Sequence, residues 1–183
     1  MVLDGYEGSW FAVQVRPRRE MVIARALGDK GYEYFAPVYV SRRRWSDRWK
    51  EVQMPLFPGY VFCRFSLEAL SPIIMTPGVL RIVGTRREPV AIPDSEIQSL
   101  ARASKSNSKV QPHEYLAAGA RVRITDGPLA GLEGTVRGYG NQCYLILSIY
   151  LIRRSISVEI DHRHIELVHT APTGHRPYLA WAS

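Results

Sequence analysis

The spacing of apolar residues in the first half of the chain predicts strands that alternate with helices. Residues 10–15 are β-branched and aromatic and stop before Pro17, as a strand does. Residues 18–31 place apolar side chains on one helical face and end in glycine, which predicts a helix. Further strands are predicted over residues 32–45, 49–54, 59–65 and 79–84, and further helices over residues 66–78 and 92–104. The expected fold class is therefore α+β, an open antiparallel sheet with helices on one side.

The pattern changes after residue 104, where a second unit is expected. Residues 105–114 are small and polar, which is the composition of a flexible linker, so the two units should move with partial independence. Short apolar runs follow, separated by glycine or aspartate, and they predict a small all-β barrel. The runs cover residues 120–125, 131–140, 142–152, 155–160 and 164–168. The predicted organisation is a domain over residues 1–104, the linker, a barrel over residues 115–168 and a mobile tail over residues 169–183.

Composition places the chain among ordinary globular proteins. Of its 183 residues, 46% are hydrophobic and 22% are charged. The longest apolar run, residues 144–152, falls short of the roughly 18 residues of a membrane span. The N-terminus lacks a basic segment followed by an apolar core, so no signal peptide is expected. We therefore expect a cytoplasmic protein in which Cys63 and Cys143 are buried, reduced thiols.

The net charge of +7 suggests an anionic partner, and the positive charge is concentrated in one segment. Residues 42–50, RRRWSDRWK, hold five basic residues and one aspartate at the tip of an expected hairpin. Tryptophans among cations suit single-stranded or distorted nucleic acid. Alternatively, the tip is merely solvated, or Trp45 and Trp49 pack on each other across the hairpin. The nucleic-acid candidates from this segment are Arg42, Arg43, Arg44 and Arg48.

Signals of catalysis are sparse. The sequence contains no nucleotide-binding glycine loop, nucleophile elbow or zinc-finger spacing. Only His162 and His164 come close together, at a spacing that places both on one face of a strand. Because no third ligand is nearby in sequence, surface histidines are the simpler interpretation. We expect no enzyme activity, no metal and no cofactor, and an enzyme stays possible only if the two histidines hold a metal.

Residues 55–65, PLFPGYVFCRF, place a rigid elbow directly before an apolar strand. Pro58 and Gly59 are a strong turn signal, and a turn needs no function. Phe57 and Tyr60 flank the turn, so the elbow can also display two aromatic side chains to a partner at little entropic cost. The alternative is that both aromatics belong to the core, because alternation around the glycine leaves their facing open.

Glycines are closely spaced in residues 122–136, VRITDGPLAGLEGTV. This string resembles the KOW motif of the small SH3-like barrels found in NusG-type transcription factors and several ribosomal proteins. In the first half, WFAVQVRPRRE, PLFPGYVF and TPGVLRIVG resemble the N-terminal domain of the NusG family in order and spacing. The resemblance covers residues 9–168, and residues 42–60 look more like the specialised UpxY and RfaH type of paralogue.

The resemblance implies a role and a set of site residues for the first half. Proteins of this family bind the clamp helices of the β′ subunit of RNA polymerase through an apolar patch on the sheet. On this chain the matching residues are Phe57, Pro58, Tyr60 and Ile82. By position, Arg16 and Lys30 match residues that contact the non-template DNA strand in RfaH-like proteins.

The resemblance also implies a partner for the barrel, which would be a small-subunit ribosomal protein or Rho. The matching residues are Leu129, Leu132 and Ile152. Arg153 stands where the family commonly has glycine, which changes this edge of the strand. The implied function is that of a monomeric bacterial elongation factor that suppresses pausing and termination. The rival hypothesis is an RNA-binding or ribosome-associated KOW protein.

Overall fold

The computed structural model describes residues 8–45, 48–85, 88–106, 108–113, 121–139 and 142–168. Within these ranges, no helix is both long and apolar enough to cross a membrane. The tail expected over residues 169–183 lies outside the described residues.

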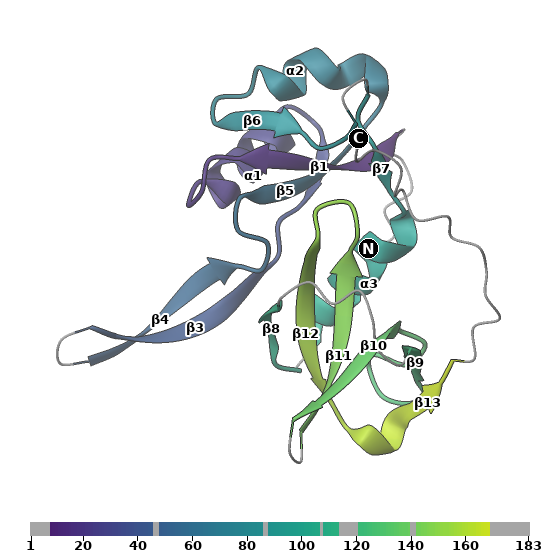
Figure 1. Ribbon diagram of the computed structural model, residues 1–183. Coiled ribbons are helices and arrows are strands. Elements are labelled where there is room, and N and C mark those ends of the chain that lie inside the picture. The colour runs from purple at the N-terminus through teal and green to yellow at the C-terminus, as the bar shows by residue number, and fades with distance from the viewer. Residues whose placement is uncertain are drawn as a thin grey trace, which may run out of the picture.

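The first half folds around an antiparallel sheet (Figure 1). Its elements are β1 (Ser9–Val15), α1 (Glu20–Asp29), β2 (Glu33–Phe35), β3 (Val38–Trp45), β4 (Arg48–Pro55), β5 (Tyr60–Phe65), the 3-10 helix η1 (Leu67–Ala69), α2 (Leu70–Ile74), β6 (Val79–Ile82), β7 (Ala91–Ile92) and α3 (Asp94–Lys105). The strand order of the sheet is β2-β5-β1-β6, and β7 also pairs with β1. Strands and helices follow one another along the chain in the predicted order, so the α+β class is confirmed.

The strand predicted over residues 32–45 is in fact two strands that belong to different sheets. Glu33 of β2 pairs with Arg64 of β5, whereas Val38 of β3 pairs with Pro55 of β4. Pro37 lies between the two strands and has no N–H to donate to a ladder. The chain therefore leaves the main sheet at this proline.

The sheet is covered on both faces, so the expectation of helices on one side is wrong. On one face, Phe11 and Val13 of β1 pack in a cluster with α1 and α2. On the other face, Trp10 and Ala12 lie in a second cluster that includes α3. Successive side chains of a strand point to opposite faces, and in β1 both sets are apolar. Each face of the sheet therefore needs a cover.

The second half is an antiparallel sheet, which confirms the all-β prediction. Its elements are β8 (Val110–His113), β9 (Arg121–Ile124), β10 (Glu133–Tyr139), β11 (Gln142–Ile149), β12 (Arg154–Ile160), the 3-10 helix η2 (His162–His164) and β13 (Ile165–Leu167). The strand order is β13-β9-β10-β11-β12-β8. β8 lies inside the predicted linker. It pairs Val110 with Val158, and its backbone thereby provides hydrogen-bond partners for the edge of β12 that would otherwise be free.

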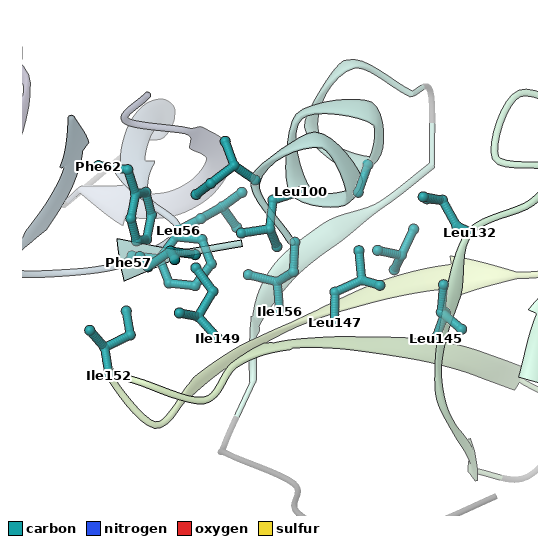
Figure 2. Close-up of a cluster of buried hydrophobic side chains, with 14 of the residues drawn as sticks. Leu56, Phe57, Phe62, Leu100, Leu132, Leu145, Leu147, Ile149, Ile152 and Ile156 are labelled. Atoms are coloured by element: carbon teal, nitrogen blue, oxygen red, sulfur yellow. The ribbon is translucent and has the colours of Figure 1, made fainter. Parts of the chain in front are cut away.

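One apolar cluster joins the two halves, although the linker composition predicts units that move separately. Figure 2 shows Leu56 and Phe57 of the first half beside Ile149 and Ile156 of the second, with Leu100 of α3 next to them. All five side chains are buried. Removing apolar surface from water is worth roughly 25 cal/mol per Å², so a flexible linker does not prevent the halves from closing on each other.

β3 and β4 form a two-stranded sheet of their own that projects from the body of the protein (Figure 1). The ladder runs from Val38 opposite Pro55 to Trp45 opposite Arg48. This confirms the predicted hairpin with the basic segment at its tip. From Arg48 to Gln53, the β4 side chains are all exposed.

Both cysteines are free thiols, as the sequence predicts. Cys63 is buried in β5, while Cys143 of β11 is half-buried. Burial, together with the charge of Glu33, raises the pKa of the Cys63 thiol to about 12. This thiol is therefore protonated and unreactive at neutral pH.

Candidate functional site

The elbow before β5 is held from two sides by hydrogen bonds. The Val15 N–H donates to the Gly59 carbonyl over 2.9 Å, and the Gly59 N–H donates to Glu20 Oε1 over 2.8 Å. Glu20 opens α1 and is only 4% exposed. The φ of Gly59 is 82°, in the region that favours glycine. The end of β1, the start of α1 and the elbow are therefore tied into one unit.

The structure differs from the outward display of aromatics that the elbow suggests. Phe57 is 2% exposed and meets the ring of Phe62 edge to face, with the centroids 5.2 Å apart. Tyr60 is half-buried against the same cluster, and Pro58 is exposed. The second half contributes to this cover, since Ile149 lies beside Phe57 (Figure 2). Phe57 is thus buried at the junction of the two halves.

Ile82 lies apart from the elbow residues. It pairs with Val13 in the ladder and is half-buried against the cluster that contains α1. Phe57 belongs to the cluster on the opposite side of the sheet. The structure therefore does not bring Ile82 and Phe57 onto one face.

The candidate partner residues of the second half are buried in the cluster that joins the halves. These residues are Leu129, Leu132 and Ile152. Ile152 lies in the turn between β11 and β12, and Arg153 follows it with a φ of 50°. The arginine thus adopts the left-handed backbone that glycine takes more easily.

The two basic candidates outside the hairpin have different surroundings. Arg16 is exposed and lies directly beside the elbow. Its backbone N–H donates to the Gly78 carbonyl over 2.9 Å, which leaves the side chain to face solvent. Lys30 instead directs its ammonium group to the end of α2, where Nζ donates to the Pro72 carbonyl over 2.9 Å and to Thr76 Oγ1 over 2.7 Å. The structure thus favours Arg16 over Lys30 as a group available to a ligand.

The hairpin ladder separates its two tryptophans. Trp49 pairs with Arg44 and Trp45 pairs with Arg48, so positions 45 and 49 fall on opposite faces and the tryptophans are not cross-strand partners. Trp49 is 69% exposed, and Arg44 and Arg48 are exposed as well. Arg42 Nε donates to Glu51 Oε1 over 3.1 Å. Arg43 pairs with Lys50 in the backbone ladder, and its side chain lies outside the described part.

The paired histidines lie in the 3-10 helix η2 and not along one face of a strand. The backbone N–H of Arg163 donates to Asp161 Oδ1 over 2.9 Å, which starts this helical turn. His164 Nε2 lies 3.8 Å from Asp126 Oδ2. In the described ranges, no three side chains of metal-binding type gather at one place.

Two features of this site escaped the sequence analysis. Glu20 was not recognised as the anchor of Gly59, because a carboxylate in the first turn of a helix is common and does not indicate a distant partner. The face of α3 formed by Ile97, Leu100 and Ala103 was not recognised as a contact for the second half. Its helical spacing predicts a buried face and does not say against which partner.

Glu96 in the first turn of α3 is partly buried, and this burial can be tested through its dependence on pH. Burial raises the pKa of Glu96 from 4.5 to about 7. Folding therefore favours the protonated form, and this contribution to stability is complete below pH 4.5 and is lost as the pH rises through about 7. We expect Glu96→Gln to stabilise the chain more at about pH 8 than at about pH 4.5, measured by denaturant unfolding.

The matched control is Glu68→Gln, which changes an exposed glutamate of η1. Its effect on the free energy of unfolding should be small, because the side chain is exposed to water. Equal effects of Glu96→Gln at the two pH values would contradict the burial of this carboxyl.

Comparison with known proteins covers both halves of the chain. Residues 8–101 match the family described as "Transcription termination factor nusG". A transcription termination/antitermination protein NusG from Lactococcus lactis is 30% identical over 179 residues, which cover 90% of this chain and 95% of that protein. The protein of the same name from Helicobacter pylori is 24% identical over 175 residues, covering 87% of this chain and 98% of the relative.

A solved structure shares the fold. It is described as "Domain interaction in Thermotoga maritima NusG", has a TM-score of 0.51 and 20% sequence identity, and covers 87% of this chain and 97% of its own. The family match contains the elbow, Arg16 and the whole hairpin, and the full-length relatives extend the likeness through the second half.

Proposed function

Because this chain belongs to the NusG family, we propose that it is a non-enzymatic bacterial elongation factor that binds RNA polymerase and suppresses pausing and termination. The relatives are named as transcription termination/antitermination proteins, which supports a role in transcription. The observation that carries the finer proposal is the apolar sheet face around Phe57, which the second half covers.

This face has the properties of a protein-docking surface. Trp10, Phe57 and Phe62 lie in one cluster, and Tyr60 borders it. Aromatic side chains dominate the binding energy of interfaces when a partner buries them. When the second half moves away, the face becomes an exposed apolar patch, which a soluble domain does not keep without a partner. We assign the β′ clamp helices to this face on the basis of the family resemblance.

Nucleic acid would be contacted by the exposed cations near this face and on the hairpin. Arg16 follows β1 directly, and the Val15–Gly59 hydrogen bond fixes its distance from the elbow. Arg44 and Arg48 are exposed on the hairpin. Contacts of this kind bind phosphates without reading sequence, as an elongation factor that travels with polymerase requires. The proposed ligand is the non-template DNA strand.

The barrel would bind its own partner with residues that are buried in the closed arrangement. Ile152 and Leu129 belong to the same cluster as Phe57. A partner of the barrel, such as a ribosomal protein or Rho, would therefore compete with the first half for these side chains. We propose that the closed arrangement is a resting state in which each half hides the docking surface of the other.

The proposal is tested by titrating purified core RNA polymerase with the full chain and with Tyr60→Ala. Tyr60 is half-buried beside the proposed face, so its truncation should weaken polymerase binding by about 10- to 100-fold. The matched control is Val22→Ala on α1, because Val22 is 58% exposed on the opposite side of the sheet. Failure of the parent chain to bind polymerase, while it binds structured RNA, would favour the RNA-binding alternative.

A further inference from the structure

The hairpin of β3 and β4 is exposed in a way that calls for a partner. It pairs with no other strand of the described chain and projects from the body (Figure 1). Both faces of β4 are exposed from Arg48 to Gln53. An isolated two-stranded hairpin is only marginally stable in water, since it has no second layer to pack against. The large exposed side chains of this hairpin therefore contribute little to folding and are available to bind a partner.

One face of the hairpin has a shallow, open hollow lined by Arg42, Trp49 and Glu51. Arg42 lies directly opposite Glu51 in the ladder, and Trp49 stands two residues before Glu51 on the same face. Arg44 is the cross-strand partner of Trp49, so a second cation lies on this face. The hollow thus combines a wide aromatic surface, a donor and an acceptor.

The Arg42–Glu51 pair places a donor and an acceptor side by side. Arg42 Nε donates to Glu51 Oε1 over 3.1 Å, and both side chains are largely exposed. An exposed ion pair of this kind contributes little to stability. Its outer N–H groups and its second carboxylate oxygen can still bond to a ligand.

We propose that Trp49, Arg42 and Glu51 form a binding site for one unpaired nucleobase of a single strand. The base stacks on the indole of Trp49, and its edge bonds to the guanidinium of Arg42 and the carboxylate of Glu51. Arg44 contacts a neighbouring phosphate. A base inside a duplex is stacked on both faces and paired along its edge, so only an unpaired base offers both surfaces. This site extends the nucleic-acid contact of the proposed function and rests on it.

Charge favours nucleic acid over a protein as the ligand of this site. Residues 42–50 carry five basic residues and one aspartate. Their field attracts a polyanion to the hairpin before any base is bound. Stacking accounts for Trp49, whose indole is presented to water among these cations.

The test measures binding of the full chain to labelled single strands of about 12 nucleotides, in DNA and RNA, over a range of salt concentrations. Trp49→Ala should weaken binding by about 5- to 100-fold, and Trp49→Phe should retain most of the affinity. The salt slope should stay unchanged in Trp49→Ala, since stacking releases no counterions, whereas Arg44→Ala should reduce it by about one. Binding to duplex should change little in Trp49→Ala.

The matched control is Val52→Ala, since Val52 lies on the opposite face of the same strand and is 36% exposed. It should bind single strands as the parent does. Parent-like binding of single strands by Trp49→Ala would overturn the site. A loss of polymerase binding by Trp49→Ala in the absence of nucleic acid would also overturn it, because Trp49 would then contact polymerase. Titration of polymerase with the parent chain reports on the proposed function separately, because it does not involve the Trp49 variants.

Discussion

Phe57→Ala is expected to lower the free energy of unfolding of the full chain by about 3–5 kcal/mol, the usual cost of truncating a buried phenylalanine. The ring is almost fully buried and contacts Phe62 edge to face, so its removal leaves a cavity between the two halves. Urea unfolding followed by circular dichroism measures this loss. If Phe57 stood on an exposed patch, as the elbow alone suggests, folding would be nearly unaffected.

Leu80→Ala is the matched control for this loss of stability. Leu80 lies in β6 of the same sheet and is about half exposed, so its truncation should change the free energy of unfolding by no more than about 0.5 kcal/mol. A loss below about 1 kcal/mol for Phe57→Ala would show that the ring is not part of a packed core. Polymerase binding by the folded Phe57→Ala protein should still be weakened, since the ring also belongs to the proposed docking face.

Ile152→Glu should separate the halves and raise the affinity for polymerase by at least about tenfold. Ile152 is buried in the turn after β11, where its side chain meets the cluster that joins the halves (Figure 2). A carboxylate without a partner is costly to bury, so the turn would move into water. A protein whose binding-competent form is rare gains apparent affinity when that form becomes the main one. Polymerase titration measures the gain, and limited proteolysis of the segment before β8 reports the separation.

Leu167→Glu provides the control, because Leu167 lies in β13 of the same half and is exposed. It adds the same charge and should change neither proteolysis nor polymerase binding. Separated halves with unchanged polymerase affinity would show that the covered face is not the docking face. In the Ile152→Glu background, Phe57→Ala should cost less stability than in the parent, because part of its packing is already lost.

Local pattern accounts for most of the elements of the fold. Helical spacing identified α1 and α3, and β-branched and aromatic runs identified β1 and β5, because each pattern reflects the faces of a single element. The hairpin and the strands of the second half were also predicted. The misses are short or interrupted elements such as β7 and β8, whose existence depends on the free strand edge that they pair with.

The site residues were found less completely, for the same reason. The sequence marked Phe57 and Tyr60 as a pair, yet the structure buries Phe57 and leaves Tyr60 only half-buried. It marked Ile82 on the basis of resemblance, and this residue lies on the other side of the sheet. It noticed Trp49 among the cations, but only the ladder places Arg42 and Glu51 beside it.

The sequence by itself determined the two unlike halves, the rigid elbow and the basic hairpin, and its resemblance to a known family indicated the kind of protein. The halves, the elbow and the hairpin follow from residue types and spacings within single segments, which neighbours along the chain control. Only the tertiary structure decided that the second half and α3 cover the apolar face around Phe57, and that Glu20 anchors Gly59. An apolar face specifies that it must be buried, and the choice among several possible covers depends on which surfaces fit one another in three dimensions.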